Sequence, residues 1–294
     1  MTPRAAVPAL SGPACALLAF ALLAIGDAAA KALAFRNPPL QIAFLYTVSA
    51  AGLVALWALR QDWQTLRPRH PGLIGLRASC SVIAGLAGLY AFVNLSLAEA
   101  YTILFMAPVI VTALSRPFLG EAVGTRRWLA ALAGMAGIVL VLRPGFRDLG
   151  IGHAAALLAA TAVAISSLVL RHIGSREARV TLTFVPMCAG LVVTALALPF
   201  VYRPMRLDDL GFCLVLGALI ALGQFMLVNA YRASPAAVVA PFHYSQMVWA
   251  LLFGALVFGD RPDPWLATGA AAVIGSGLVL LWLDNRATTP PSSS

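Results

Sequence analysis

Residues 12–31 read GPACALLAFALLAIGDAAAK, and residues 152–171 return to the same pattern as GHAAALLAATAVAISSLVLR. At this offset of 140 positions eight residues are identical, and Lys31 stands opposite Arg171. Similarity between two segments at a fixed spacing indicates an internal repeat. We therefore predict a chain built from two copies of one unit.

A second match supports the repeat at the other end of each copy. The letters FLGE at 118–121, followed by WLA at 128–130, correspond to VFGD at 257–260, followed by WLA at 265–267. Segments rich in alanine and leucine match easily by chance, but here the flanking turn residues match as well. The boundaries that follow are 1–148 for the first repeat, 149–286 for the second, and 287–294 for a polar, disordered tail.

The composition places both copies in a membrane. Hydrophobic residues make up 61% of the chain, charged residues only 11%, and the mean hydropathy is +0.89. Soluble domains contain roughly 45–50% apolar and about 25% charged residues, so a soluble fold is excluded. A helix that crosses the bilayer needs about 20 mostly apolar residues.

Apolar windows bounded by Arg, Pro, Gly and Asp predict ten membrane-spanning helices. Their ranges are about 10–34, 40–59, 72–94, 97–117, 127–143, 152–171, 180–201, 209–231, 235–258 and 265–283. With five helices in each copy, the second copy enters the membrane from the opposite side. Such inverted repeats are typical of secondary transporters that work by alternating access around a central cavity.

The basic residues predict the orientation. Of the 20 Lys and Arg residues, 13 fall on the side of the N-terminus and 7 on the other side of the ten predicted helices. The excess marks the cytoplasmic side, so we expect a bacterial inner membrane protein with both termini in the cytoplasm. The four cysteines are far apart in apolar stretches, which predicts neither a disulfide framework nor a metal site.

Several motifs carry a resemblance to a known family. In the second repeat they are APFHYSQ at 240–246, WA at 249–250, FGDRPD at 258–263 and SG at 276–277. In the first repeat they are LAEA at 97–100, AP at 107–108, LGE at 119–121, RW at 127–128 and Gly137. The chain resembles EamA-type members of the drug/metabolite transporter superfamily. The resemblance implies ten helices, cytoplasmic termini and transport of small metabolites. Many of these relatives carry an Arg in helix two, where this chain has Tyr46.

Asp27 and Lys31 are charged residues deep in the first predicted helix. A charge at this depth costs about 2.5–3.5 kcal/mol on insertion scales, so it needs a partner or an aqueous cavity. One interpretation is an ion pair between neighbouring turns, with Lys31 reaching toward the surface. The other makes Asp27 a proton-coupling carboxylate inside a cavity.

Further polar and aromatic side chains within predicted helices are the candidate substrate-binding residues. They are Tyr90, Asn94, Tyr101, Phe105, Ser166, Ser167, Gln224, His243, Tyr244, Gln246 and Trp249. Such residues either form a substrate wall or join helices by hydrogen bonds. His243 is also a second candidate proton carrier, or else a buried structural histidine. Glu99, by contrast, is read as part of a capping box that begins with Ser96.

No nucleophile motif, metal-ligand cluster or phosphate loop is present, which argues against an enzyme, and no cofactor is expected. We predict a secondary active or facilitative transporter, and we favour export of amino acids or related amphipathic compounds. Uptake of a vitamin or an S-adenosylmethionine-like metabolite, or a membrane scaffold without transport, are the alternatives. The expected partners are a small-molecule substrate, the lipid bilayer and a proton, without nucleic acid, in a monomer or homodimer.

Overall fold

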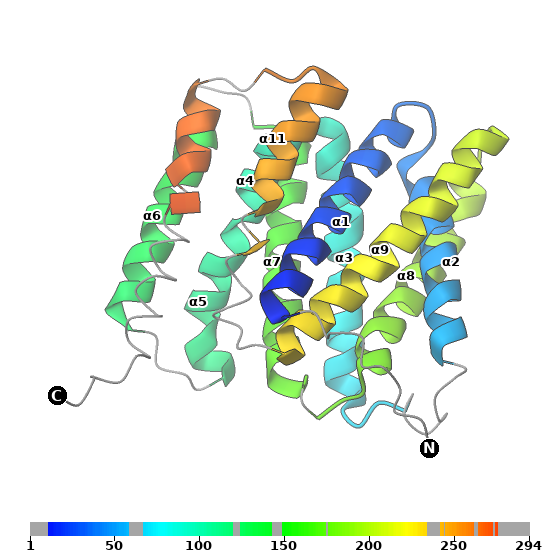
Figure 1. The fold of residues 1–294 in the computed structure, drawn as a ribbon, viewed down its shortest axis with the longest axis horizontal. Coiled ribbons are helices and arrows are strands. Elements are labelled where there is room, and N and C mark those ends of the chain that lie inside the picture. Colours follow the sequence, from blue (N-terminus) through cyan, green and yellow to red (C-terminus); the bar gives the residue numbers. More distant parts are fainter. Residues whose placement is uncertain are drawn as a thin grey trace, which may run out of the picture.

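A computed structural model describes residues 11–58, 67–119, 124–142, 149–174, 176–233, 242–243, 245–261, 264–272 and 274–275. This part of the chain is helical and contains no strand (Figure 1). The helices are α1 (Gly12–Ala34), α2 (Pro39–Ala58), α3 (Pro71–Asn94), α4 (Leu97–Leu104), α5 (Met106–Leu119), α6 (Thr125–Leu142), α7 (Ile151–Ile173), α8 (Arg179–Val201), α9 (Leu207–Ala233) and α11 (Ser245–Phe258). A final helical segment covers 264–272 and 274–275.

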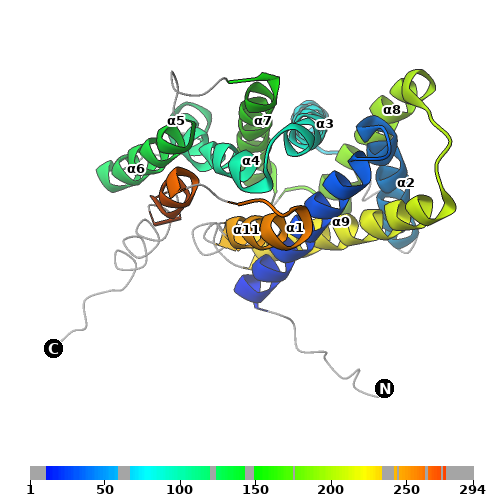
Figure 2. The same ribbon diagram turned by 90° about the horizontal axis from the view of Figure 1, so that it is seen from above.

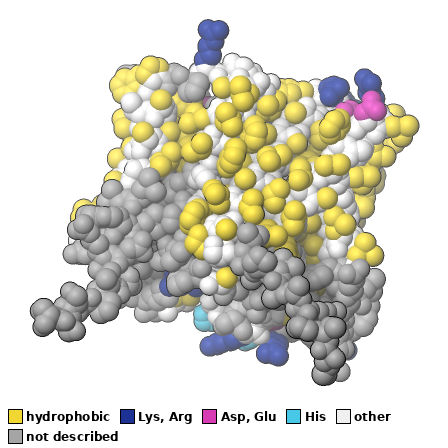
Figure 3. Space-filling view, in the orientation of Figure 1, with side chains coloured by type: hydrophobic (Ala, Val, Ile, Leu, Met, Phe, Trp, Pro, Cys, Tyr) yellow, Lys and Arg dark blue, Asp and Glu magenta, His cyan; other side chains and the backbone are white. Residues whose placement is uncertain are grey.

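These helices form ten segments when α4 and α5 are counted as one interrupted helix, which confirms the predicted architecture. Six of them, α1, α2, α3, α7, α8 and α9, are long and apolar enough to cross a bilayer. In the space-filling view, hydrophobic side chains cover the middle of the molecule, and the visible Lys, Arg, Asp and Glu lie at its upper and lower edges (Figure 3). The chain is a multi-pass membrane protein.

We call the two edges the first face and the second face, and each is defined by the loops that it carries. The first face carries the start of α1 and the residues 67–70, 174 and 176–178, and the second face carries 35–38, 202–206 and 259–261 (Figure 1).

Contacts between the repeats follow an approximate two-fold relation. Helix α1 packs against α9, and α3 packs in the same way against α7. Helix α2 contacts α9, as α8 contacts α3, while α2 and α8 contact each other (Figure 2). Exchanging α1 with α7, α2 with α8 and α3 with α9 therefore reproduces these contacts. Each of these helix pairs combines one helix of the first repeat with one helix of the second.

Glycines allow the helices of the α1–α9 and α2–α9 pairs to approach closely. A Cβ atom on Gly223 would lie 3.3 Å from the carbonyl oxygen of Ala19, and one on Gly26 would lie 3.2 Å from Ile220. Where α9 meets α2, a Cβ atom on Gly217 would collide with the carbonyl oxygen of Tyr46. Small residues at such positions let helix backbones pack tightly within a membrane.

The predicted single helix over 97–117 is wrong in one detail, because the structure interrupts it at Phe105 between α4 and α5. Pro108 has no N–H group and cannot bond to the carbonyl of Leu104, four residues earlier, so the turn is free to open there. The N-cap is confirmed, since the Ser96 hydroxyl accepts a hydrogen bond from the Glu99 backbone at 3.2 Å. The Glu99 side chain instead meets His153 of the other repeat at 3.2 Å.

Two buried carboxylates fasten the repeats together at opposite faces. On the first face, Glu177 accepts hydrogen bonds from the His70 backbone at 2.7 Å and lies 3.0 Å from the His70 ring. On the second face, Asp209 accepts from Asn37 at 3.1 Å and lies 3.6 Å from Arg36. Each contact joins the loop after the first helix of one repeat to the start of the third helix of the other. The approximate two-fold relation therefore extends to these polar contacts.

We expect the first-face contact to depend on pH. Burial raises the pKa of Glu177, but hydrogen bonds from the Arg69 and His70 backbones and from the His70 ring outweigh it and hold the pKa below its ordinary 4.5. Because the pKa is lowered by folding, the contact stabilises the folded protein above pH 4.5 and loses this effect as the pH falls through the folded-state pKa. Hydrogen bonds to charged groups contribute roughly 1.5–3 kcal/mol.

Glu177→Gln should therefore lower the melting temperature in detergent at neutral pH, and the difference from the unmodified protein should shrink as the medium is acidified below about pH 4. Asp208→Asn is the matched control, because the Arg206–Asp208 pair is more than 70% exposed on both sides and should contribute little. Equal melting temperatures for Glu177→Gln and the unmodified protein at neutral pH would contradict the prediction.

Candidate functional site

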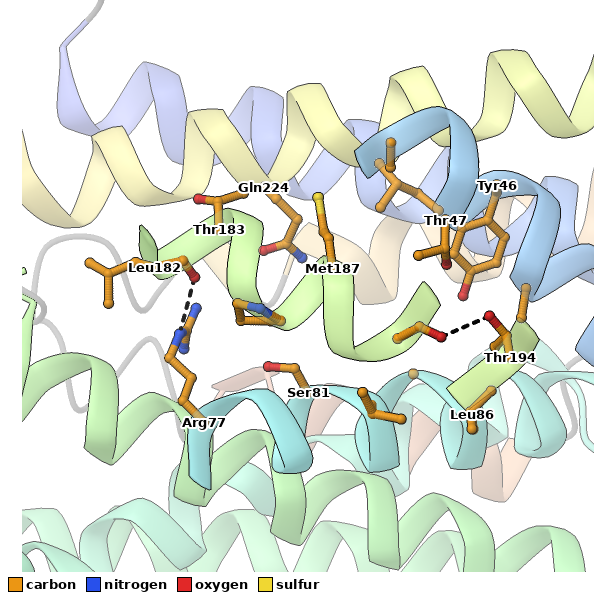
Figure 4. Close-up of a pocket in the computed structure, with 17 residues that line it drawn as sticks. Tyr46, Thr47, Arg77, Ser81, Leu86, Leu182, Thr183, Met187, Thr194 and Gln224 are labelled. Atoms are coloured by element: carbon orange, nitrogen blue, oxygen red, sulfur yellow. Dashed lines mark hydrogen bonds between the residues drawn. The ribbon is translucent and has the colours of Figure 1, made fainter. Parts of the chain in front are cut away.

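A cavity with a volume of about 200 Å³ opens where the second and third helices of both repeats meet, between α2, α3, α8 and α9. It lies on the approximate two-fold axis, because these four helices exchange with one another under it. Its wall mixes aliphatic side chains with polar ones (Figure 4). The principal polar lining residues are Tyr46, Thr47, Arg77, Ser81, Thr183 and Gln224.

The charged side chain of this wall is Arg77, which lies within the membrane-spanning part of α3 and is 9% exposed. Its Nε donates a hydrogen bond to the carbonyl of Leu182 in α8 at 3.4 Å (Figure 4). That carbonyl is available because Pro186, four residues later in α8, has no N–H group to occupy it. The proline thus creates an acceptor at the place where the guanidinium reaches α8.

Helix α7 supplies the other acceptors for Arg77. Its Nη1 donates to the Ser166 carbonyl at 3.1 Å and to the Ser166 hydroxyl at 2.9 Å. The hydroxyl of Ser81 lies 3.3 Å from that of Ser166. Arg77 consequently joins α3 to both α7 and α8, and Ser166, although not a wall residue itself, fixes the orientation of one that is.

Asp27 lies beside the cavity within an aromatic cluster, defined as Phe20, Phe92, Tyr101, Phe105 and His243. Tyr101 donates a hydrogen bond to the Asp27 carboxylate. The Tyr101 ring packs against Phe92 and Phe105, with centroids 5.2 and 6.4 Å away. His243 meets Phe105 edge to face at 5.7 Å and stacks on Phe20 at 4.7 Å. The cluster thus joins α1, α3 and α4 of the first repeat to residues 242–243 of the second.

Asp27 and Lys31, for which an ion pair was one interpretation, have separate partners in the structure. The Lys31 ammonium donates to the Leu95 carbonyl at 2.7 Å and lies 4.9 Å from the centre of the Phe258 ring. Asp27 instead turns toward Tyr101. The carboxylate therefore has a hydroxyl as its partner and is not neutralised by the neighbouring lysine.

Two residues connect Asp27 to the cavity. Tyr46 lines the cavity and is close enough to Asp27 to be influenced by its charge. Ile220 also lines the cavity and packs against Gly26, the residue before Asp27. Tyr46 and Ile220 thus belong both to the cavity wall and to the surroundings of Asp27.

The remaining candidate residues take several positions. Gln224 lines the cavity. Gln246 is buried and hydrogen-bonds His243, and Trp249 stacks on Phe253 with ring centres 6.0 Å apart. The residues away from the cavity are Tyr90, which is 43% exposed, Asn94, which donates to the Tyr90 carbonyl, and Ser167, which is exposed. Tyr244 lies outside the described residues.

The sequence analysis does not include Arg77 among the candidate site residues, because it treats the residue as one of the 13 basic residues that predict the orientation. The sequence signal that could have identified Arg77 as a site residue is its depth within the predicted third helix. Six residues beyond Pro71, it lies about 9 Å along the helix axis, and an ionisable group at that depth marks a functional site by default. The role of Pro186 required knowing that α3 faces α8.

A second cavity of about 370 Å³ lies between α4, α11 and the second face. Glu99, Asp260 and Arg261 contribute charges to its wall. Glu99 also meets His153 of α7, so the wall includes a contact between the repeats. Among the described residues, no group of three or more His, Cys, Asp or Glu side chains could hold a metal ion.

Comparison with known proteins identifies the family. The model of the EamA-like transporter family matches twice, over residues 10–143 and 150–282. A riboflavin transporter of Rhizobium johnstonii is 32% identical, over 85% of this chain and 81% of the relative. An S-adenosylmethionine uptake transporter of Rickettsia bellii is 22% identical (92% and 93%), and a pseudopaline exporter of Pseudomonas aeruginosa is 24% identical (92% and 95%).

The fold is also that of a solved protein. A crystal structure with 18% sequence identity superposes with a TM-score of 0.65, covering 94% of this chain and 96% of the other. The relatives are named as transporters, so this chain is a small-molecule transporter and not an enzyme. With one family match in each of its two repeats, the chain belongs to the EamA-like transporter family.

Proposed function

We propose that the chain moves small organic metabolites across the membrane by alternating access through the cavity between α2, α3, α8 and α9. The observation that carries the proposal is the position of this cavity on the axis that relates two inverted repeats. Transporters built from inverted repeats bind their substrates at the repeat interface. The wall offers hydroxyls, an amide, a guanidinium and an aromatic ring, which suits an amphipathic solute.

The size of the cavity favours a solute of amino-acid dimensions. Pockets that enclose drug-sized ligands measure roughly 300–1,000 Å³, whereas this one measures about 200 Å³. Export of amino acids or related amphipathic compounds is therefore the first candidate. Uptake of a vitamin is the second, supported by the relative named as a riboflavin transporter. A riboflavin-sized molecule would require the cavity to widen.

We assign proton coupling to Asp27, with His243 as the second candidate. A carboxylate held by a hydroxyl inside the helix bundle, near residues that line the cavity, can take up a proton and release it as the surroundings change during the transport cycle. His243, the second candidate, lies between the rings of Phe20 and Phe105, and Gln246 is its polar neighbour.

We further propose that the first face lies toward the cytoplasm of a bacterial inner membrane, and the excess of Arg on this face supports the proposal. Both termini then lie in the cytoplasm. The proposal requires only one chain for a complete cavity, which fits a monomer, and a homodimer would contain two independent cavities.

Transport by purified protein in proteoliposomes tests the proposal. Labelled amino acids, riboflavin and S-adenosylmethionine would be offered in turn, with and without a pH gradient and in both directions, with protein-free vesicles as the control. We expect at least one solute to cross faster than in protein-free vesicles and to accumulate when the gradient is imposed. Failure of every solute to move in either direction would contradict the proposal.

A further inference from the structure

Arg77 differs from the other cations of the described chain because it is buried in the cavity wall and makes no ion pair. The described carboxylates are Asp27, Glu99, Glu177, Asp208, Asp209 and Asp260, and none of them contacts Arg77. Its hydrogen-bond acceptors are two backbone carbonyls and one hydroxyl, all of them neutral. A buried cation held only by neutral groups retains its full charge toward any solute that enters the cavity.

The described contacts of the guanidinium do not engage all of its N–H donors. It carries five N–H groups, and the bonds to Leu182 and Ser166 engage Nε and Nη1. The Nη2 amino group has no hydrogen-bond partner among the residues that the structure describes. Because Leu182 and Ser166 hold the planar group from α8 and α7, its orientation is set before a ligand arrives.

The neighbouring wall adds neutral donors and no negative charge. Ser81 lies on the same helix, one turn from Arg77, and Gln224 approaches from α9 (Figure 4). Neither the described lining of this cavity nor the hydrogen bonds of Arg77 include a carboxylate. A pre-oriented guanidinium beside hydroxyl and amide donors matches the chemistry that binds a carboxylate or a phosphate.

We infer that Arg77 is the anion-binding residue of the cavity, and that the transported solute carries a carboxylate or phosphate group that Nη2 engages. The inference rests on the proposed function, because it places the solute in the same cavity. It narrows the substrate class to anions and zwitterions. A solely structural Arg77, which clamps α3 to α7 and α8, would show no preference for anionic solutes.

Paired probes of equal size test this assignment on the purified full-length protein. Phenylalanine and phenylalaninamide differ in one carboxylate, as do benzoate and benzamide, and phenyl phosphate separates phosphate from carboxylate. Binding would be measured by the shift in melting temperature across a titration of each probe. We expect at least one acid to bind and the corresponding amide to bind about 30-fold or more weakly. Equal binding of both members in every pair would overturn the assignment, even if no variant can be purified.

Arg77→Gln should remove the preference for the acid, and Arg77→Lys should restore part of it. Ser166→Ala is the matched control, since it removes one bond to the guanidinium but keeps the charge, and it should weaken acid binding less than Arg77→Gln. An unchanged acid preference in Arg77→Gln would overturn the assignment. Suppose that Arg77→Gln carries neutral solutes such as riboflavin as fast as the unmodified protein, and that its acid preference is also unchanged. The transport proposal would then stand, and the anion-binding role of Arg77 would be contradicted. Acid binding that depends on Arg77, without transport of any solute, would support the anion-binding role of Arg77 and contradict the transport proposal.

Discussion

Asp27→Asn should reduce pH-driven uptake to the level of protein-free vesicles while the protein still folds and exchanges solute down its gradient. Asparagine has nearly the same shape as aspartate and can still accept the hydrogen bond from Tyr101. It cannot take up a proton. The variant therefore removes proton uptake at position 27 and changes little else.

The surroundings of Asp27 define the controls. Tyr101 and Tyr46 are its titratable neighbours on α4 and α2, and His243 and Lys31 lie nearby in contacts of their own. Tyr101→Phe keeps the ring contacts and the carboxylate, so it should keep a response to the pH gradient. Asp27→Glu should restore part of it. A full response in Asp27→Asn would transfer the coupling to another group, with His243→Gln as the next variant.

Gly217→Ala should be among the most destabilising single substitutions in the described part of the chain. The new Cβ atom would collide with the carbonyl oxygen of Tyr46, lie 2.6 Å from Ser49 and lie 3.0 Å from the backbone nitrogen of Ala50. Two of these atoms belong to the backbone of α2, so relief requires the whole helix to move away from α9. Overpacking typically costs about 1–3 kcal/mol, and displacement of the Ser49 hydrogen bond to Leu214 adds to it.

The measurement is the melting temperature and the yield of monodisperse protein in detergent. Gly211→Ala is the matched control on the same helix, because nothing lies within 4 Å of its added Cβ atom. Alanine is the better helix former by roughly 1 kcal/mol, so this variant should be as stable as the unmodified protein or slightly more so. Equal melting temperatures for the two variants would contradict the close packing of α2 against α9. Transport should decline with Gly217→Ala, since α2 and α9 both form the cavity wall.

The architecture could be predicted because the membrane imposes it. Bilayer thickness fixes the length of each apolar segment, and the repeat fixes how the segments are grouped. The expected helix at 152–171 is thus observed at Ile151–Ile173, and that at 180–201 is observed at Arg179–Val201. The N-cap at Ser96 was readable because capping is local. The interruption at Phe105 was not, since Pro108 permits an opening without determining where it occurs.

The candidate site was harder to predict, because a membrane helix can be apolar on every side and its sequence then does not show which side faces a cavity. Tyr90 and Gln224 are both polar residues in predicted helices, yet only Gln224 lines the cavity. The sequence shows how deep Arg77 lies in its helix but not which helices surround it. Its place in the wall depends on how α3 packs against α7 and α8, and this packing is tertiary.

Blocking the cavity tests the central claim, that solute passes between α2, α3, α8 and α9, most directly. Gly85 lines the cavity and has nothing within 4 Å of an added Cβ atom, so a cysteine fits there. Gly75, on the same helix, has equal space but does not line the cavity. Each cysteine would be introduced after replacing Cys15, Cys80, Cys188 and Cys213, and would be labelled with a bulky thiol reagent before the proteoliposome assay.

Labelled Gly85→Cys protein should lose uptake of the solute that the transport panel identifies, while labelled Gly75→Cys protein keeps it, and excess solute should slow the labelling of Gly85→Cys. Uptake by fully labelled Gly85→Cys protein at the unlabelled rate would contradict passage through this cavity.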